Sequence, residues 1–240
     1  MRYPKSIFFF LLMVLPWGAW SQVDNVPEYG KQYIYGINKS SHSGLIGGLV
    51  YRFSWALSPR TYHTIAVEAL NIKHPRENRV QSGVTGNLFI PGKTNYLYAI
   101  RTTYGRDWLL FKKAPQQGVQ INGIATAGPV FGLLAPYYVQ TGPANGQRVN
   151  EPYDPNKHQI SEIYGSGGLF QGLPESSVNI GLSAKVGLSF EFGTYKSNLA
   201  GFETGFAIDA FTKQMEIMPF AKNRAVFPSA YLNLFWGSRR

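Results

Sequence analysis

An alternation of apolar and polar side chains from Val178 to Phe192 is the clearest pattern in the chain. Every second residue from Val178 onward is apolar, and the positions between them are polar, charged or glycine. A period of two over this length predicts a β-strand, because a helix face repeats every 3.6 residues. The stretch is also longer than the ~5–6 residues of an average strand in a soluble protein. Its length is typical of a tilted strand that crosses a membrane.

Seven further stretches have strand-like patterns, and no long amphipathic helix pattern occurs between them. The eight predicted strands cover residues 31–38, 44–55, 61–72, 94–105, 117–128, 178–192, 198–212 and 225–237. An even number of antiparallel strands can close on itself, which leaves no unpaired edge in lipid. The sequence therefore predicts an all-β fold, a closed antiparallel eight-stranded transmembrane β-barrel with long extracellular loops.

The predicted connections are unequal at the two ends of the barrel. With both termini in the periplasm, the inner turns are 56–60, 106–116 and 193–197, and the outer loops are 39–43, 73–93, 129–177 and 213–224. Short periplasmic turns and longer extracellular loops are typical of membrane barrels. The loop 129–177 far exceeds an ordinary connection, so it is the main candidate for binding a ligand at the cell surface.

Charged residues within the predicted strands test the orientation of the faces. Seven of them share the polar face: Arg52, Glu68, Arg101, Lys185, Glu191, Glu203 and Asp209. Turned outward, each basic residue near the membrane midplane would cost about 2–4 kcal/mol. Pointing inward, three basic and four acidic groups nearly balance, so we expect a salt-bridged lumen filled with side chains rather than a conducting pore. Lys31 opens its strand at the rim and is the exception.

A soluble eight-stranded cup is the alternative fold. It would place the apolar face inside and the seven charges in water, which is physically acceptable. The large apolar residues on the shared face and the unequal loops favour the membrane barrel.

The N-terminal region has the features of a secretory signal peptide. Arg2 and Lys5 precede an apolar run over 7–14, and Ala19-Trp20-Ser21 fits a small-x-small cleavage site. We expect a signal peptide over 1–21, a periplasmic tail over 22–30 and the barrel over 31–237. An uncleaved anchor is the alternative, but the apolar run is shorter than the ~20 residues of a spanning helix.

Composition agrees with export to the outer membrane. Aromatic residues and charged residues each make up 15% of the chain, whereas soluble domains have about 25% charged residues. Without cysteine there is no lipoprotein attachment site, disulfide or thiolate metal site. The net charge of +10 would suit nucleic acid, but on an exported protein we expect basic residues to meet outer-membrane lipid, lipopolysaccharide or an envelope protein complex. No cofactor is expected.

Short stretches through most of the mature chain resemble a known group of barrels. They are Tyr104-Gly105-Arg106, Leu110-Phe111-Lys112-Lys113, Gly118-Val119-Gln120-Ile121, Pro136-Tyr137-Tyr138, Tyr153-Asp154-Pro155 with His158, Ile163-Tyr164-Gly165 and Phe190-Glu191-Phe192. They resemble a Bacteroidetes-type family of small outer-membrane barrels, similar in architecture to PorT-like and OmpA-like eight-stranded barrels. The resemblance implies the fold and the location but supplies no catalytic residues. By analogy it implies a structural or accessory subunit of a secretion or outer-membrane assembly complex.

Two segments outside the predicted strands are candidate binding sites. In the loop 129–177, Asp154 and His158 could share a metal or hydrogen-bond site, while the alternative, a turn capped by Asp154, is favoured by the residue types. The predicted turn 106–116 combines apolar and basic residues: Trp108, Leu110, Phe111, Lys112 and Lys113. They could dock a periplasmic partner, but we favour an interfacial belt with Trp108 at the depth of the headgroups.

The sequence indicates no catalytic site. Residues 86–94 resemble a phosphate loop, but the spacing is one residue too long and Asn87 stands where the first glycine belongs. An outer-membrane lipid-modifying enzyme needs a histidine with a serine and a carboxylate. His42-Ser43, His63 and His74 show no convincing spacing of this kind. We therefore expect a non-catalytic barrel, with a lipid-modifying enzyme or a surface-ligand-binding barrel as the alternatives.

Overall fold

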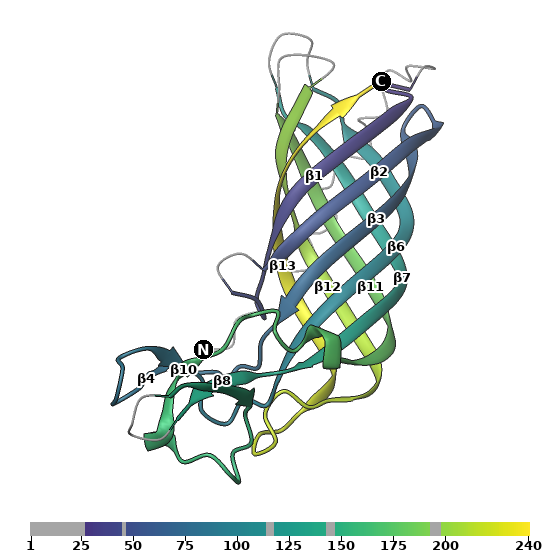
Figure 1. Ribbon diagram of the computed structural model, residues 1–240. Coiled ribbons are helices and arrows are strands. Elements are labelled where there is room, and N and C mark those ends of the chain that lie inside the picture. The colour runs from purple at the N-terminus through teal and green to yellow at the C-terminus, as the bar shows by residue number, and fades with distance from the viewer. Residues whose placement is uncertain (1–26, 45–46, 114–117, 143–146, 193–197) are drawn as a thin grey trace, which may run out of the picture.

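Eight long strands form a closed antiparallel barrel in the computed structural model, which describes residues 27–44, 47–113, 118–142, 147–192 and 198–240 (Figure 1). The barrel strands are β1 (Lys31–Ser40), β2 (Gly48–Ser58), β3 (Thr61–Ile72), β6 (Asn95–Phe111), β7 (Gln120–Pro136), β11 (Ser177–Phe192), β12 (Asn198–Met215) and β13 (Arg224–Arg239). Each pairs with its neighbours in the chain, and β13 closes the ring onto β1. The predicted eight-stranded barrel is confirmed. The predicted signal peptide 1–21, the tail residues 22–26 and the turn 193–197 lie outside the described residues.

Two strands extend by six or more residues beyond their predicted ends. β6 continues to Phe111, so the predicted turn 106–116 was wrong over its first half. β7 continues to Pro136, so the predicted loop 129–177 was also wrong over its first eight residues. Proline and glycine near residue 129 resemble a turn signal, but β7 pairs with β6 on both sides of Pro129 and with β11 throughout. Pairing with two neighbouring strands overrides the local signal at this position.

The long connections at one end of the barrel form a separate unit, which we call the head and define as residues 73–94, 137–142 and 147–176 (Figure 1). The head contains the two-stranded sheet of β4 (Val80–Gln81) and β5 (Leu88–Phe89), and a three-stranded sheet in the order β10-β8-β9. Those three strands are β8 (Tyr138–Thr141), β9 (Val149–Pro152) and β10 (Ile163–Ser166), and two short 3-10 turns cover Ile160–Glu162 and Leu173–Glu175. Phe89, Tyr137, Tyr153 and Ile163 form part of its hydrophobic core.

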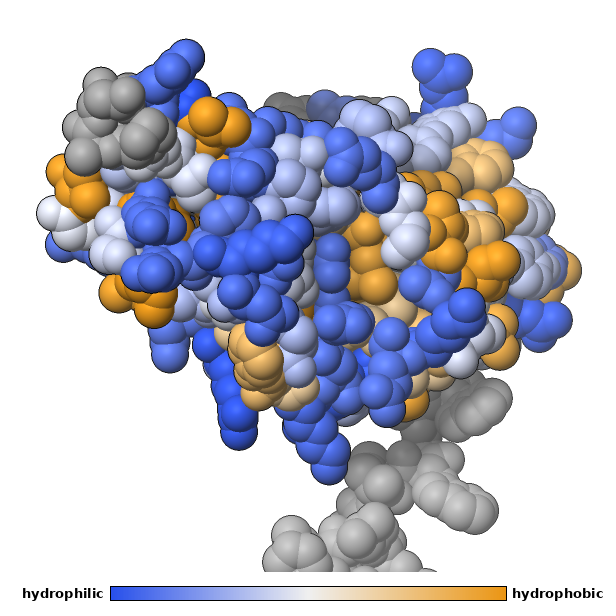
Figure 2. Space-filling view, turned by 60° about the horizontal axis from the view of Figure 1, so that its bottom comes forward, coloured by the Kyte–Doolittle hydropathy of each residue, from blue (hydrophilic) through white to orange (hydrophobic). Residues whose placement is uncertain are grey.

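Apolar side chains cover the outer wall of the barrel, while charged and polar side chains point inward. Leu182 and Phe206 are both 70% exposed on the outer wall, whereas their neighbours Ser183 and Ala207 are buried. Figure 2 shows orange, apolar side chains gathered over the barrel and blue ones over much of the loop end. This arrangement is that of a membrane barrel, and it is the reverse of a soluble cup. In the described part of the chain, no helix is long and apolar enough to cross a membrane.

Aromatic side chains contact one another on the outer wall near the end that holds the C-terminus. Trp55 stacks on His63, whose ring in turn stacks on Tyr104, with centroid distances of 5.3 and 5.8 Å. Further along the wall, Phe190 stacks on Phe202. Aromatic rings at one level of the outer wall are typical of the membrane–water interface.

Candidate functional sites in the lumen and the head

Six charged side chains form what we call the central ion network inside the barrel. They are Arg52, Glu68, Arg101, Lys185, Glu203 and Asp209, all buried. Three are cations and three are anions, so the network is neutral. The structure therefore brings six of the seven charges selected from the sequence into one cluster.

Glu203 is the most connected acid of this network. Its carboxylate accepts hydrogen bonds from Arg52 at 2.5 Å and from Lys185 at 2.9 Å, and from the hydroxyl of Tyr231 at 2.8 Å. Lys185 also pairs with Glu68. A buried charge is tolerated only when it is paired and hydrogen-bonded in this way.

The ion pairs of the network cross the lumen. Arg101 on β6 binds Asp209 on β12 at 2.6 Å and Glu68 on β3 at 2.9 Å. In the order of the strands around the ring, β6 and β12 are three positions apart. The same separation holds for β2 and β12, joined by the Arg52–Glu203 pair. Since the pairs bridge distant walls, side chains fill the lumen at this level.

A second ionic cluster lies nearer to the C-terminal end of the barrel. Arg239 pairs with Glu191 and, at 3.4 Å, with Glu28. Its guanidinium also lies over the ring of Tyr29, which stacks on Tyr62. The sequence placed Glu191 in the lumen but missed its partners, because the last strand was predicted to end at 237 and residues 22–30 were assigned to a free tail. The period-two alternation of β13 would have placed Arg239 inside.

Asp107 is a further lumenal acid that the sequence did not predict. It is 1% exposed, and Ser54 donates a hydrogen bond of 3.4 Å to its Oδ2. Within the described residues, its Oδ1 has no hydrogen-bond partner. Asp107 lies within the predicted turn 106–116, whereas the alternation of β6 places its side chain inside the barrel and that of Trp108 outside.

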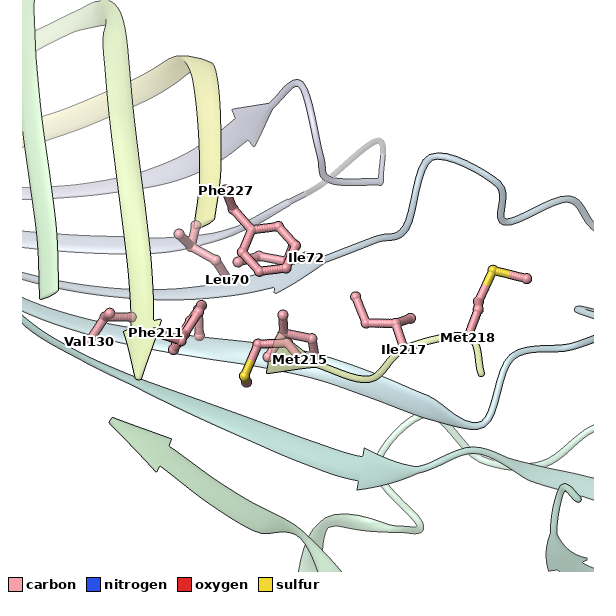
Figure 3. Packing of buried hydrophobic residues seen from close by; sticks show 10 residues of the cluster. Leu70, Ile72, Val130, Phe211, Met215, Ile217, Met218 and Phe227 are labelled. Atoms are coloured by element: carbon pink, nitrogen blue, oxygen red, sulfur yellow. The ribbon is translucent and has the colours of Figure 1, made fainter. Parts of the chain in front are cut away.

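Apolar side chains close the lumen at the end that carries the head. This group, which we call the plug, includes Leu70, Ile72, Leu97, Val130, Phe211, Met215, Ile217, Met218 and Phe227 (Figure 3). Phe211 and Phe227 pack edge to face with a centroid distance of 5.9 Å. Gly132 leaves room for them, since a Cβ there would lie 2.6 Å from both Phe211 and Met215. The plug and the central ion network therefore occupy the lumen at two levels.

A buried ion pair within the head lies against the first residues of β6. Nζ of Lys93 lies 2.8 Å from Glu77 Oε2 and 4.1 Å from the ring centroid of Tyr96. Burial lowers the pKa of Lys93, and the carboxylate of Glu77 opposes this shift. Because Lys93 is enclosed by these contacts, it is not placed to bind a phosphate, in agreement with the rejection of a phosphate loop over 86–94.

The pair of Asp154 and His158 forms a capped turn. Nδ1 of His158 accepts the backbone N–H of Asp154 at 3.0 Å, and the Asp154 carboxylate accepts the N–H of Asn156 at 2.9 Å. The other ring nitrogen of His158 lies 3.3 Å from Glu151. In the part of the chain that the structure describes, no group of three or more His, Cys, Asp or Glu side chains is arranged to hold a metal ion. The geometry corresponds to the turn-capping alternative.

The segment proposed to dock a periplasmic partner lies mostly on the outer wall. Trp108, Leu110 and Phe111 belong to β6 and point outward, and Lys112 and Lys113 follow directly after it. Apolar and aromatic residues on the wall followed by lysines match the interfacial belt. Docking of a periplasmic partner by these residues stays a prediction.

The histidines make contacts that differ from those of a hydrolytic site. His42 Nδ1 lies 3.2 Å from the hydroxyl of Ser41 rather than Ser43. His63 bonds to the hydroxyl of Tyr104 on the outer wall, and His74 accepts the backbone N–H of Arg76. Among the described histidines, none bridges a serine hydroxyl and a carboxylate.

Comparison with protein-family models gives no match, and comparison with curated proteins gives none either. Solved structures that match include Ail, the attachment invasion locus protein of Yersinia pestis, in complex with the heparin analogue sucrose octasulfate, at 11% identity and a TM-score of 0.39 over 88% of this chain and 99% of that one. Neisserial surface protein A matches at 12% identity and a TM-score of 0.40, over 89% and 97% of the two chains. The N-terminal barrel domain of Pseudomonas aeruginosa OprF matches at 8% and 0.33, over 88% and 98%. At this level the likeness indicates no function, and the fold assignment rests on the strand topology.

Proposed function

We propose that this protein is a non-conducting, non-catalytic barrel of the bacterial outer membrane that presents its head at the cell surface for binding. The observation that supports this role is the double closure of the lumen by the central ion network and the plug. A barrel closed in this way cannot serve as a channel. The head is then the region that carries the binding function.

The location in the outer membrane is supported by the surface of the barrel. The outer wall is apolar, aromatic rings gather near one end, and the closed ring pairs the backbone groups of its strands. The larger connections of membrane barrels face the exterior, so the head lies outside the cell and the C-terminal end faces the periplasm.

Within this proposal, the head binds a protein of the envelope, as in an accessory subunit of the kind that the Bacteroidetes-type family resemblance implies. Val84 and Ile160 are exposed apolar side chains on the head, at 59% and 60%. β9 is an edge strand of the three-stranded sheet. Exposed edges and apolar side chains favour binding to another polypeptide.

A mild-detergent pull-down with a tagged protein tests the role of the head. We expect the wild type to recover a defined envelope protein, and the variant Val84→Asp with Ile160→Asp to lose it. The matched control, Asn78→Asp with Asn156→Asp, adds the same charge at exposed polar positions of the head and should keep the partner. Recovery of the barrel alone by the wild type would refute the accessory role.

Planar-bilayer recording tests whether the barrel is non-conducting, and lipid analysis tests whether it is non-catalytic. Purified protein should show no unitary conductance, and stable channels would contradict a closed lumen. The lipid A of a deletion strain should keep its acyl pattern in mass spectrometry, whereas an altered pattern would favour the lipid-modifying enzyme.

A further inference from the structure

Three connections at the head end of the barrel contact one another, and two of them carry basic side chains. The backbone N–H of Lys73, after β3, donates to the carbonyl of His42, after β1, at 2.7 Å. The ring of His74 lies 3.4 Å from the carbonyl of Lys222, in the connection before β13. These contacts hold what we call the basic rim, which consists of Lys73, Arg76, Lys222 and Arg224.

All four side chains of the basic rim are cationic. Arg76, Lys222 and Arg224 are exposed, and no member of the rim forms an ion pair within the described residues. The carboxylate of Glu77, the acid beside Arg76 in the chain, binds Nζ of Lys93 and accepts the backbone N–H of His74. Burial and the charge of Arg224 lower the pKa of His42, which agrees with a positive potential at this point.

An apolar hollow lies in the outer wall on the same strand as Arg224. Ala184, Val186, Phe206, Ile208 and Pro228 line it, with the backbone around Lys185, Ala207 and Ser229. The small side chain of Ala184 leaves the space that larger neighbours surround. Arg224, Val226 and Pro228 alternate outward along β13, and four residues of strand place the hollow about 14 Å from Arg224.

We propose that the basic rim and the hollow together form a binding site for one phosphorylated, acylated glycolipid of the outer leaflet. Arg224 and Lys222 bind a phosphate of its headgroup, since guanidinium and ammonium groups suit phosphate oxygens. An acyl chain lies along the outer wall of β13 and enters the hollow. The proposal takes its orientation in the membrane from the proposed function. A free anion would need only the rim, whereas a lipid uses the apolar hollow as well.

Binding of lipid A to the detergent-purified full-length protein, measured by native mass spectrometry, tests the charged half of the site. The wild type should bind bis-phosphorylated lipid A at least ~10-fold more tightly than dephosphorylated lipid A. Arg224→Gln with Lys222→Gln should remove this preference. The control, Arg148→Gln with Lys157→Gln, removes two exposed cations from the head and should keep it. Equal losses in both variants would show non-specific attraction and would overturn the site.

Filling the hollow tests the apolar half. Ala184→Phe should weaken binding of bis-phosphorylated lipid A, while Ala200→Phe, an exposed outer-wall position of β12 near the opposite end, should leave it unchanged. Unchanged binding in Ala184→Phe would exclude the hollow from the site. These assays need no assumption on orientation. Labelling of Lys157 by an impermeant amine reagent on intact cells tests the proposed orientation separately, since the reagent reaches only an external head.

Discussion

The guanidinium of Arg101 on β6 binds both carboxylate oxygens of Asp209 on β12, with Nε–Oδ1 at 2.8 Å and the second nitrogen–oxygen contact at 2.6 Å. The third nitrogen of the same group donates to Glu68 at 2.9 Å. Bidentate geometry of this kind is strong and directional. It ties together strands that are three positions apart in the ring, so Arg101 acts as a cross-brace of the lumen.

Asp209→Asn should lower the free energy of unfolding by about 3–5 kcal/mol, because it leaves the charge of Arg101 buried with one acid instead of two. Arg101→Met with Asp209→Leu removes a cation and an anion together and should recover most of the loss. Denaturant unfolding of the barrel in lipid vesicles measures both. If Asp209→Asn were as stable as the wild type, the Arg101–Asp209 pair would make no net contribution to the free energy of unfolding.

Gly187→Ala should destabilise the barrel by about 1–3 kcal/mol through overpacking. A Cβ at this position would collide with the hydroxyl of Tyr231, which donates to Glu203 at 2.8 Å. Gly123→Ala is the control, since its Cβ would meet Leu110 at 3.5 Å, an ordinary contact. We expect the control to stay within about 0.5 kcal/mol of the wild type in the same unfolding assay. Equal effects of the two substitutions would contradict this packing argument.

An arginine scan of the outer wall tests the interfacial belt. Val186→Arg, near the middle of β11, should cost about 2–4 kcal/mol, whereas Leu110→Arg should cost only about 0–1 kcal/mol if it lies at the interface. Folding equilibria in vesicles give both values. A cost for Leu110→Arg as large as that for Val186→Arg would place the segment in the hydrocarbon and refute the belt.

The connection between His42 and Lys73 should weaken in acid. Burial and Arg224 hold the pKa of His42 below its ordinary value of 6.5, so the folded loop favours the neutral ring. This contribution to stability is fully present above pH 6.5 and is lost as the pH falls through the lowered pKa. Hydrogen exchange of the Lys73 amide should therefore accelerate, relative to the intrinsic pH effect, as the pH falls below 6.5.

His42→Gln should abolish this acid dependence. His74 and Arg224 line a small pocket together with His42, separate from the hollow around Ala184. His74→Gln therefore serves as the matched control and should retain the acid dependence. The same acceleration in His42→Gln would assign the effect to another group.

Much of the barrel was predictable because one face of each strand meets lipid and the other meets the polar lumen. Apolar and polar residues therefore alternate along the strand. That pattern oriented Arg52, Lys185 and Glu203 correctly. It did not give their partners, since pairing across the lumen depends on the register of strands far apart in the sequence. Asp107 and Arg239 were missed for another reason. Strand ends were inferred from local glycine, proline and polar signals, and pairing with neighbouring strands extends β6 and β13 beyond those signals.

The head and the basic rim were largely hidden from sequence reasoning. Strands of two to four residues, such as β4 and β9, are too short for alternation to be visible. The basic rim is held by three connections that are separated along the chain. The backbone contact of Lys73 with His42 and the contact of His74 with Lys222 show that they meet.

The seam between the first and last barrel strands has a consequence for assembly. Glu28 and Arg239, which meet at the C-terminal end of the barrel, are 211 positions apart in the chain, and the ladder between β1 and β13 joins similarly distant segments. The entropy cost of closing a loop increases with its length, so contacts of such long range are the most costly to form. We therefore expect the sheet to form hairpin by hairpin, with the pairing of β1 and β13 formed last. Under mechanical force, this pairing should be the first to separate.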